Sequence, residues 1–311
     1  MLLLLKRNWR IIMRNTVVKK LNEFYDKNND VCFITADMGF GAFEPVFEKY
    51  GKKRALNVGI AEQNMASFSA GLGLGGKKVF TYSISTFPTL RCLEQIRDDI
   101  CYHELDISIL NVGTGFEYGP LGITHHSTED IAILRAIPNM KVYAPANARE
   151  TELVMDEVFK IGGPSYIRLS KLGAEDFSAN STTINFAQNN NGKYAIFSTG
   201  TIMQEALDFN KLNNNKLDIY SVVNYFKNQQ EIAEMLKKYD KIISLEEHQI
   251  SGGLYSYLCE IKNKFDLNVK IIPLAIKDEF TCTVGKQKEL RKHYHIGKDA
   301  ILETCIKEGM L

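Results

Sequence analysis

The sequence predicts an α/β protein with two doubly wound domains, in each of which helices cover both faces of a parallel sheet. Short apolar runs alternate with stretches of helical periodicity along most of the chain, which is typical of parallel strands joined by helices. A polar segment without apolar periodicity, at 178–192, interrupts this alternation. We therefore expect an N-terminal extension at 1–13, a first domain at 14–177, a linker at 178–192 and a smaller second domain at 193–311.

The apolar runs are the expected strands, and the periodic stretches between them are the expected helices. In the first domain we expect strands at 31–35, 79–82, 107–112, 141–144 and 166–169, with helices at 88–102, 128–136 and 148–160. In the second domain we expect strands at 194–198, 217–222, 241–245 and 269–274, with helices near 230–238 and 254–264.

Charge and cysteine content exclude several functional classes. The chain has 38 basic and 37 acidic residues, so its net charge of +1 gives no attraction to nucleic acid or to an anionic membrane. Six cysteines without a Cys-x-x-Cys pair indicate reduced thiols and a cytoplasmic location. The leucines at 2–5 are too few for a signal peptide or a membrane span. The expected partners are small molecules and other proteins.

One glycine pattern imitates a dinucleotide-binding motif. Gly71, Gly73 and Gly76 satisfy the G-x-G-x-x-G fingerprint. That fingerprint requires a strand before it and a helix after it, whereas these glycines follow a helical stretch and precede the strand at 79–82. We expect them to end a helix and to allow close packing.

Three positions carry polar side chains at places where ligands often bind. Glu62 begins a predicted helix, where a carboxylate either stabilises the helix dipole or serves a function. Asp37 follows the strand at 31–35, at the edge where open α/β sheets bind ligands. His125 precedes Ser127 and Asp130, which predict a helix N-cap. A metal site at His125 and its neighbouring histidine is disfavoured because no carboxylate or cysteine follows at ligand spacing.

The segment 57–65, Asn-Val-Gly-Ile-Ala-Glu-Gln-Asn-Met, resembles the pyrimidine-binding motif of the transketolase and deoxyxylulose-phosphate synthase family. Further motifs follow in family order: Thr-Ala-Asp at 35–37, Ser-Thr-Phe at 85–87, Gly-Ile-Thr-His at 122–125, Arg-Ala-Ile-Pro-Asn at 135–139, Glu-Glu-His at 246–248 and Gly-Gly at 252–253. From about Arg14 to near the C-terminus, the chain is similar to the C-terminal half of a split transketolase.

The resemblance implies a thiamine diphosphate-dependent transfer of a two-carbon ketol unit from a ketose to an aldehyde. Glu62 would hydrogen-bond the aminopyrimidine of the cofactor and favour the tautomer that activates it. Phe87 would stack on the pyrimidine, and Asp37 would lie near the cofactor or at a subunit contact. His125 would exchange protons with substrate oxygens. His248 would be structural or interfacial.

The sugar-binding positions depart from the family pattern. The family holds a sugar phosphate with Arg, Ser, His and Arg, and the corresponding positions here are Arg14, Gly41, Gly113 and Lys171. The family Asp that binds the acceptor hydroxyl corresponds to Leu121. We therefore expect substrate binding by Arg14, His125 and Lys171, and a substrate other than the usual pentose phosphate pair.

The cofactor's diphosphate has no expected anchor in this chain. The family anchors it through Mg²⁺ and a Gly-Asp-Gly motif, which this sequence lacks. We therefore expect a separate N-terminal transketolase subunit that carries Gly-Asp-Gly and Mg²⁺, in an α2β2 assembly, and no metal site of this chain's own. The alternatives are a deoxyxylulose-phosphate synthase-like or 2-oxoacid dehydrogenase-like subunit, or a non-catalytic scaffold that binds a partner.

Overall fold

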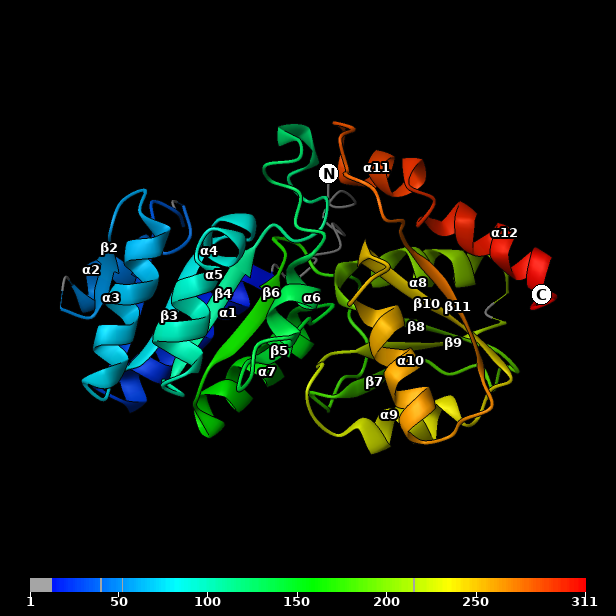
Figure 1. Ribbon diagram of the computed structural model, residues 1–311, viewed down its shortest axis with the longest axis horizontal. Coiled ribbons are helices and arrows are strands. Elements are labelled where there is room, and N and C mark those ends of the chain that lie inside the picture. Colours follow the sequence, from blue (N-terminus) through cyan, green and yellow to red (C-terminus); the bar gives the residue numbers. More distant parts are fainter. Residues whose placement is uncertain (1–12, 40, 52, 215) are drawn as a thin grey trace, which may run out of the picture.

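Two sheets lie side by side, each covered by helices on both faces (Figure 1). The computed structural model describes residues 13–311 except 40, 52 and 215, so nearly all of the extension expected at 1–13 lies outside the described residues. The first sheet is parallel, in the order β2-β1-β3-β4-β6-β5. The second has the order β11-β10-β8-β9-β7, and only β7 is antiparallel to its neighbour. The predicted fold class is confirmed.

The first half of the chain forms the six-stranded sheet and its helices. The elements are α1 (Met13–Lys27), β1 (Val31–Thr35), α2 (Glu44–Tyr50), β2 (Ala55–Asn57), α3 (Glu62–Leu74), β3 (Lys78–Ile84), α4 (Thr86–Leu90), α5 (Leu93–Gln95), a π-helical turn (Ile96–Cys101), β4 (Ile107–Val112), a 3₁₀ turn (Gly119–Leu121), α6 (Asp130–Arg135), β5 (Lys141–Tyr143), α7 (Ala148–Ile161) and β6 (Ser165–Leu169). The five predicted strands of this half are present. The short strand β2 adds to them.

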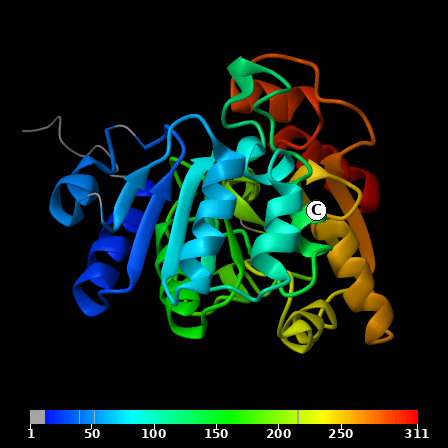
Figure 2. The ribbon, with the colours of Figure 1, turned by 60° about the vertical axis from the view of Figure 1, so that its left-hand side comes forward.

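Burial of both faces explains why these strands are almost entirely apolar or small. Every residue of β1, β4 and β6 is buried, as expected for a parallel sheet with helices on both sides. Helices α1 and α7 pack on one face, while α3 and α6 pack on the other. Figure 2 shows α3 and α4, in cyan, lying together over the strands. The carboxyl ends of β1, β2, β3 and β4 therefore meet at one edge.

The glycines of the false dinucleotide motif end α3 and precede β3. Gly75 is the C-cap of α3, and its backbone N–H donates to the carbonyl of Gly71. A Cβ on Gly73 would lie 3.2 Å from the Cβ of Leu105, so this position needs a small residue for close packing. The strand and helix order required for dinucleotide binding does not occur here.

The second half of the chain forms the five-stranded sheet and its helices. The elements are β7 (Ile184–Gln188), β8 (Ala195–Ser198), a 3₁₀ turn (Gly200–Ile202), α8 (Met203–Leu212), β9 (Asp218–Val222), α9 (Gln229–Leu236), β10 (Lys241–Gln249), α10 (Leu254–Lys264), β11 (Lys270–Ile276), α11 (Gln287–His293) and α12 (Lys298–Glu308). In the part of the chain that the structure describes, no helix combines the length and the apolar character needed to cross a membrane.

The segment expected to be a linker, 178–192, contains β7. This strand pairs antiparallel with β9 at the edge of the second sheet. Its first two residues are buried and its last three are partly exposed. An edge strand that is only half covered needs few apolar residues, which explains why its sequence reads as polar. The segment is therefore a connection that also completes a sheet, and the domain boundaries stay a prediction.

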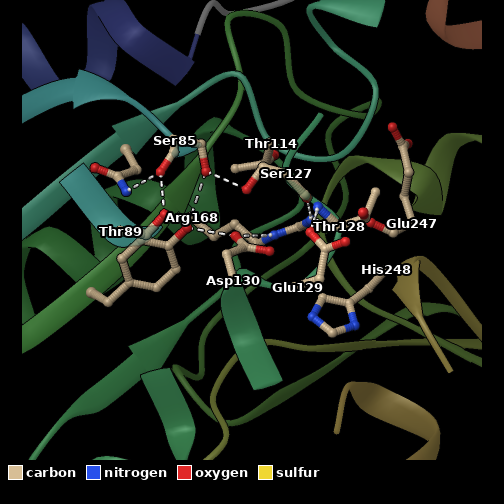
Figure 3. A network of polar contacts seen from close by, with 12 residues as sticks. Ser85, Thr89, Thr114, Ser127, Thr128, Glu129, Asp130, Arg168, Glu247 and His248 are labelled. Atoms are coloured by element: carbon tan, nitrogen blue, oxygen red, sulfur yellow. Dashed lines mark hydrogen bonds and ion pairs between the residues drawn. The ribbon is translucent and has the colours of Figure 1, made fainter. Parts of the chain in front are cut away.

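A buried polar network joins the two halves of the molecule (Figure 3). Arg168 on β6 donates through Nε to Oδ2 of Asp130, at 2.8 Å, and both side chains are almost fully buried. The Nη2 atom of Arg168 also donates to the backbone carbonyl of Ser127, at 3.1 Å, and to that of Glu247 on β10, at 3.0 Å. One guanidinium thus connects the start of α6, the loop before it and the second sheet.

The predicted N-cap formed by Ser127 and Asp130 is wrong. The N-cap position of α6 is Glu129, and no side chain caps the helix there. The Ser127 hydroxyl instead lies 2.6 Å from that of Ser85. The sequence pattern was compatible with a cap, but the buried charge of Arg168 recruits the carboxylate of Asp130.

His248 is fully buried at the same contact between the two halves. Its Nε2 accepts a hydrogen bond from the backbone N–H of Ala132, at 3.3 Å, and its Nδ1 lies 2.7 Å from the carbonyl of Gln249. Burial lowers the pKa of His248 to about 4 and raises the pKa of Glu246 to about 8. The two side chains lie 3.8 Å apart, and the lowered pKa of His248 favours its neutral form, so His248 acts as a structural hydrogen-bonding group.

Replacement of Asp130 by Asn should strongly destabilise the free chain. The change leaves the Arg168 charge buried without its counter-ion, which costs about 3–5 kcal/mol of unfolding free energy. Burial opposes ionisation of Asp130, but the Arg168 charge keeps its pKa below the ordinary value, so the stabilisation is present above the unfolded-state pKa and is lost as pH falls through the folded value.

Denaturant unfolding at neutral pH measures this loss. The matched control is Glu152→Gln, which disrupts ion pairs with the exposed Lys19 and Arg149 and should cost less than about 1 kcal/mol. Equal costs for the two variants would contradict the importance assigned to the buried pair.

Candidate active site

Glu62 is the first residue of α3 and lies just after the carboxyl end of β2. Its side chain is only 4% exposed. The positive φ of Gly59 turns the chain between the strand and the helix, and the backbone N–H of Gly59 donates to Oδ1 of Asn57, at 2.9 Å. Oε2 of Glu62 accepts a hydrogen bond from Nη1 of Arg91, at 2.8 Å. A buried carboxylate is thus held at the edge of the sheet.

Phe87 and His125 lie next to this carboxylate. Phe87 is in α4, directly after β3, and its ring carries the guanidinium of Arg91 at 4.7 Å from the ring centroid. The ring centroids of Phe87 and His125 are 5.1 Å apart in an edge-to-face arrangement. The hydroxyl of Thr86 donates to the backbone carbonyl of Thr124 and ties the two loops together, at 3.0 Å. Three of the predicted site residues, Glu62, Phe87 and His125, therefore lie in one continuous chain of contacts.

The two neighbouring histidines have different environments. His125 is partly exposed, and its Nδ1 lies 2.9 Å from the hydroxyl of Thr124. Burial and the neighbouring His126 lower the pKa of His125, which favours the neutral imidazole at neutral pH. His126 is buried, and its Nδ1 lies 2.9 Å from the carbonyl of Thr281 in the second half of the chain. Only His125 faces the solvent side of the site, whereas His126 anchors the loop.

Asp37 lies at the carboxyl end of β1, as predicted, but its contacts lead elsewhere. Its backbone N–H donates to Oδ1 of Asn57, at 3.0 Å, and its φ of 50° is in the left-handed region that Asp tolerates. Among the described residues, no hydrogen bond or ion pair connects the Asp37 carboxylate with Glu62 or His125. Asp37 therefore shapes the loop beside β2.

Arg14 and Lys171 lie around a third side chain, Tyr118. The ammonium of Lys171 is 4.3 Å from the centroid of the Tyr118 ring. Arg14 lies within hydrogen-bonding reach of the Tyr82 hydroxyl, and its charge acts on Tyr118 as well. The Tyr118 and His125 rings are 6.3 Å apart, edge to face. Tyr118 therefore connects Lys171 with the contact chain that begins at Glu62, and Arg14 acts on Tyr118 through its charge.

The backbone below Tyr118 explains the glycine at position 113. A Cβ at Gly113 would lie 1.9 Å from Cε2 of Tyr118, and the φ of Gly113 is +88°. The tyrosine ring thus fills the space that a side chain at 113 would need. A side chain at 113 and a ring at 118 are mutually exclusive in this loop.

Glu117 adds an ionisable group behind the tyrosine. Its Oε1 accepts a hydrogen bond from the backbone N–H of Lys171, at 2.7 Å. Burial raises the pKa of Glu117 to about 7, although the Lys171 charge opposes this. Within the described part of the chain, its Oε2 is buried without a hydrogen-bond partner. Such a group changes charge near neutral pH.

Sequence reasoning missed Arg91, Glu117 and Tyr118. Arg91 is four residues after Phe87 in a stretch predicted to be helical, so i,i+4 spacing was a usable signal for that contact. Glu117 and Tyr118 are in an irregular loop, and no periodicity indicates where their side chains point. Their positions depend on how that loop packs against Lys171 and Gly113.

Comparisons with known proteins identify chains that are similar to this one. Residues 10–175 match the family model described as transketolase, pyrimidine binding domain. The chain is 32% identical to a putative transketolase C-terminal section from Methanocaldococcus jannaschii, over 95% of this chain and 96% of the relative. It is 29% identical to a subunit of the apulose-4-phosphate transketolase from Actinobacillus succinogenes, over 94% of this chain and 97% of that subunit.

A solved structure shares the fold. It is titled as a split gene transketolase, inactive beta4 tetramer, and it superimposes with a TM-score of 0.80 at 24% sequence identity. The match covers 96% of this chain and 97% of that chain. The overall fold is therefore already known in a chain of similar length.

A double-mutant cycle should detect the exclusion between positions 113 and 118. Gly113→Ala should lower the unfolding free energy by about 2–4 kcal/mol, because it combines overpacking with positive-φ strain. In a Tyr118→Ala background the same change should cost about 1–3 kcal/mol less, since the ring is gone.

Denaturant unfolding of the four chains measures the cycle. Gly41→Ala is the matched control, because Gly41 has a φ of +76° but no heavy atom lies within 4 Å of the place that its Cβ would take, so only strain remains. Additive costs at 113 and 118 would contradict the proposed exclusion.

Proposed function

The chain belongs to the transketolase family and is a subunit of a split transketolase, and we propose that it forms the pyrimidine-binding half of an active site completed by a second polypeptide. The reaction is the transfer of a two-carbon ketol unit from a ketose to an aldehyde. The contact chain from Glu62 through Arg91 and Phe87 to His125 supports this proposal best.

The residues at the site fit the aminopyrimidine of thiamine diphosphate. A flat heteroaromatic ring needs an aromatic face to stack on and a hydrogen-bonding group at its edge. Phe87 offers a partly exposed ring, and Glu62 places a carboxylate beside it at the sheet edge. When bound, the cofactor supplies the carbon nucleophile that carries the two-carbon unit. Glu62 would bind and orient the pyrimidine edge and exchange a proton there.

His125 would handle protons on the sugar. Its imidazole is partly exposed and its lowered pKa keeps it neutral at neutral pH, so one ring nitrogen can accept a proton from a substrate hydroxyl. The contact between Nδ1 and the Thr124 hydroxyl orients the ring and leaves Nε2 toward the substrate side. Asp37, in this proposal, supports the loop next to the cofactor or contacts the partner.

The partner would supply the diphosphate and metal anchor. The described residues contain no cluster of three His, Cys, Asp or Glu side chains that could hold a metal ion, and the sequence has no Gly-Asp-Gly. Large apolar side chains are exposed near Glu62, at Ile60, Phe68 and Leu90. Such a surface is typical of a protein interface. We therefore propose an α2β2 enzyme in which the N-terminal polypeptide provides Mg²⁺ and covers this surface.

Cation positions support an anionic sugar as substrate. Lys171, after β6, lies over the Tyr118 ring, and the charge of Arg14, in the first helix, also acts on Tyr118, so both cations would attract a sugar phosphate bound near this ring. Gly41 and Gly113 offer no side chains for such a group, and Leu121 offers no hydrogen bond to an acceptor hydroxyl. The substrate pair would therefore differ from xylulose 5-phosphate with ribose 5-phosphate.

Two alternative functions, decarboxylation of a 2-oxoacid and non-catalytic binding of a partner, are distinguished by experiment. A deoxyxylulose-phosphate synthase-like or 2-oxoacid dehydrogenase-like subunit would decarboxylate a 2-oxoacid, and a scaffold would bind the partner without turnover. The joint presence of Glu62, Phe87 and His125 in one contact chain favours catalysis. We also propose a cytoplasmic enzyme, because all six cysteines are free thiols.

Removal of the Glu62 carboxylate should abolish most of the activity. In the complex copurified with a Gly-Asp-Gly partner, Glu62→Ala should lower kcat by about 100-fold or more, because a positioned proton-transfer group is lost. It should also weaken thiamine diphosphate binding, measured by calorimetry. Glu48→Ala, an exposed carboxylate on α2, is the control and should change neither quantity. If Glu62→Ala and the unmodified complex bind thiamine diphosphate equally well and the unmodified complex turns over no ketose, the chain is instead a non-catalytic scaffold.

Leu121 should make the enzyme tolerant of an acceptor without the hydroxyl next to its aldehyde. With hydroxypyruvate as donor, 2-deoxyribose 5-phosphate should be used at least as well as ribose 5-phosphate. Leu121→Asp should shift the ratio of kcat/KM toward ribose 5-phosphate by about tenfold, because a charged hydrogen bond to that hydroxyl is restored.

Ile123→Asp, on the same loop, controls for the added charge and should leave the ratio unchanged. Efficient ketol transfer from xylulose 5-phosphate to ribose 5-phosphate by the unmodified complex would contradict the proposed change of substrate.

A further inference from the structure

The side chain of Arg91 occupies the place proposed for the pyrimidine. Its Nη1 donates to Oε2 of Glu62, at 2.8 Å, and its guanidinium carbon lies 4.7 Å from the centroid of the Phe87 ring. These are the two contacts that the proposed function assigns to the aminopyrimidine: an edge hydrogen bond to Glu62 and a flat face on Phe87. Two flat groups cannot use the same face of Phe87 at the same time.

We propose that Arg91 is a positioning residue that substitutes for the aminopyrimidine in the free chain and leaves when the cofactor docks. Arg91 acts through Glu62, whose carboxylate it holds in the binding orientation. The inference rests on the proposed function of Glu62 and Phe87 and adds a regulation of that same site. Arg91 therefore occupies the site in the free chain, and the site opens when the pyrimidine displaces it.

The buried state of Glu62 explains why a stand-in is needed. A carboxylate that is 4% exposed loses most of its hydration, and burial of an unpaired charge is strongly unfavourable. A guanidinium is the side chain best suited to the exchange, because it is planar, stacks on aromatic rings and presents donors along its edge. It thus satisfies the carboxylate and covers the apolar ring together.

The exposure of Arg91 explains how the stand-in can leave. Its side chain is 47% exposed, so the guanidinium can move into water without opening the core. The backbone carbonyl of Arg91 accepts a hydrogen bond from Nε2 of Gln63, at 3.1 Å, which ties this position to α3 independently of the guanidinium. The pyrimidine edge would replace the hydrogen bond that Glu62 loses, and the freed guanidinium is hydrated, so displacement of Arg91 opposes cofactor binding only weakly.

Thiamine binding to the free chain tests the proposal. Thiamine carries the aminopyrimidine but no diphosphate, so it probes this half of the site without the partner. Arg91→Ala should bind thiamine about two- to fivefold more tightly than the unmodified chain, because competition from one exposed ion pair is removed. Isothermal titration calorimetry measures the dissociation constants. Thermal melting with and without thiamine gives a second readout, and the ligand-induced shift should be larger for Arg91→Ala.

Two control variants separate displacement from a general charge effect. Arg97→Ala removes an equal charge from an exposed side chain that pairs with Asp98, and thiamine affinity should not change. Arg91→Lys keeps the charge but not the flat face, so its affinity should lie between those of Arg91→Ala and the unmodified chain. If Arg91→Ala does not melt cooperatively, Arg91→Lys decides the test alone.

Each result identifies which idea fails. Unchanged or weaker thiamine binding by the Arg91 variants would overturn the stand-in role, provided that Glu62→Gln still weakens binding. If Glu62→Gln leaves thiamine affinity unchanged both in the otherwise unmodified chain and in the Arg91→Ala variant, the proposed function of Glu62 fails instead. The inference about Arg91 then fails with it. Tighter binding by Arg91→Ala that Glu62→Gln abolishes would support both.

Discussion

The buried ion pair of Arg168 and Asp130 is the interaction on which the arrangement of the site depends. A charge in the core is tolerated only where its counter-ion and hydrogen-bond acceptors are fixed, and Arg168 therefore holds groups from three parts of the chain. One of these groups is the carbonyl of Ser127, at the end of the loop that carries His125. Another is the carbonyl of Glu247 in the second sheet. The same guanidinium thus fixes the loop of the site and the position of the two sheets.

The site built on this frame has two parts. In one, Glu62, Phe87 and His125 lie in one chain of contacts that runs through Arg91. In the other, near Lys171, the Tyr118 ring occupies the space that a side chain at position 113 would need. The ring at 118 and the glycine at 113 therefore depend on one another.

Periodicity allowed the strands and most helices of the first domain to be predicted, since burial on both faces leaves long apolar runs in β1 and β4. It did not predict β7, which is paired on one side only. For the site, the motifs at 57–65 and 85–87 indicated Glu62 and Phe87, and in the structure Arg91 contacts both side chains. The partner of Glu62, Arg91, was not predicted, because an ion pair between two helices depends on their packing. The N-cap predicted from Ser127 and Asp130 was wrong for the same reason, because Asp130 pairs with Arg168, which is far away in the sequence.

The sequence by itself determined the fold class, the family motifs and the residue types available for catalysis, because these depend on local patterns of apolar and polar side chains. Only the tertiary structure decided which of these side chains meet. It paired Asp130 with Arg168, placed Arg91 between Glu62 and Phe87, and set Tyr118 over Gly113. The physical reason is that buried charges and close ring contacts are satisfied by neighbours in space, and residues far apart in the chain become neighbours only when the sheets and helices pack.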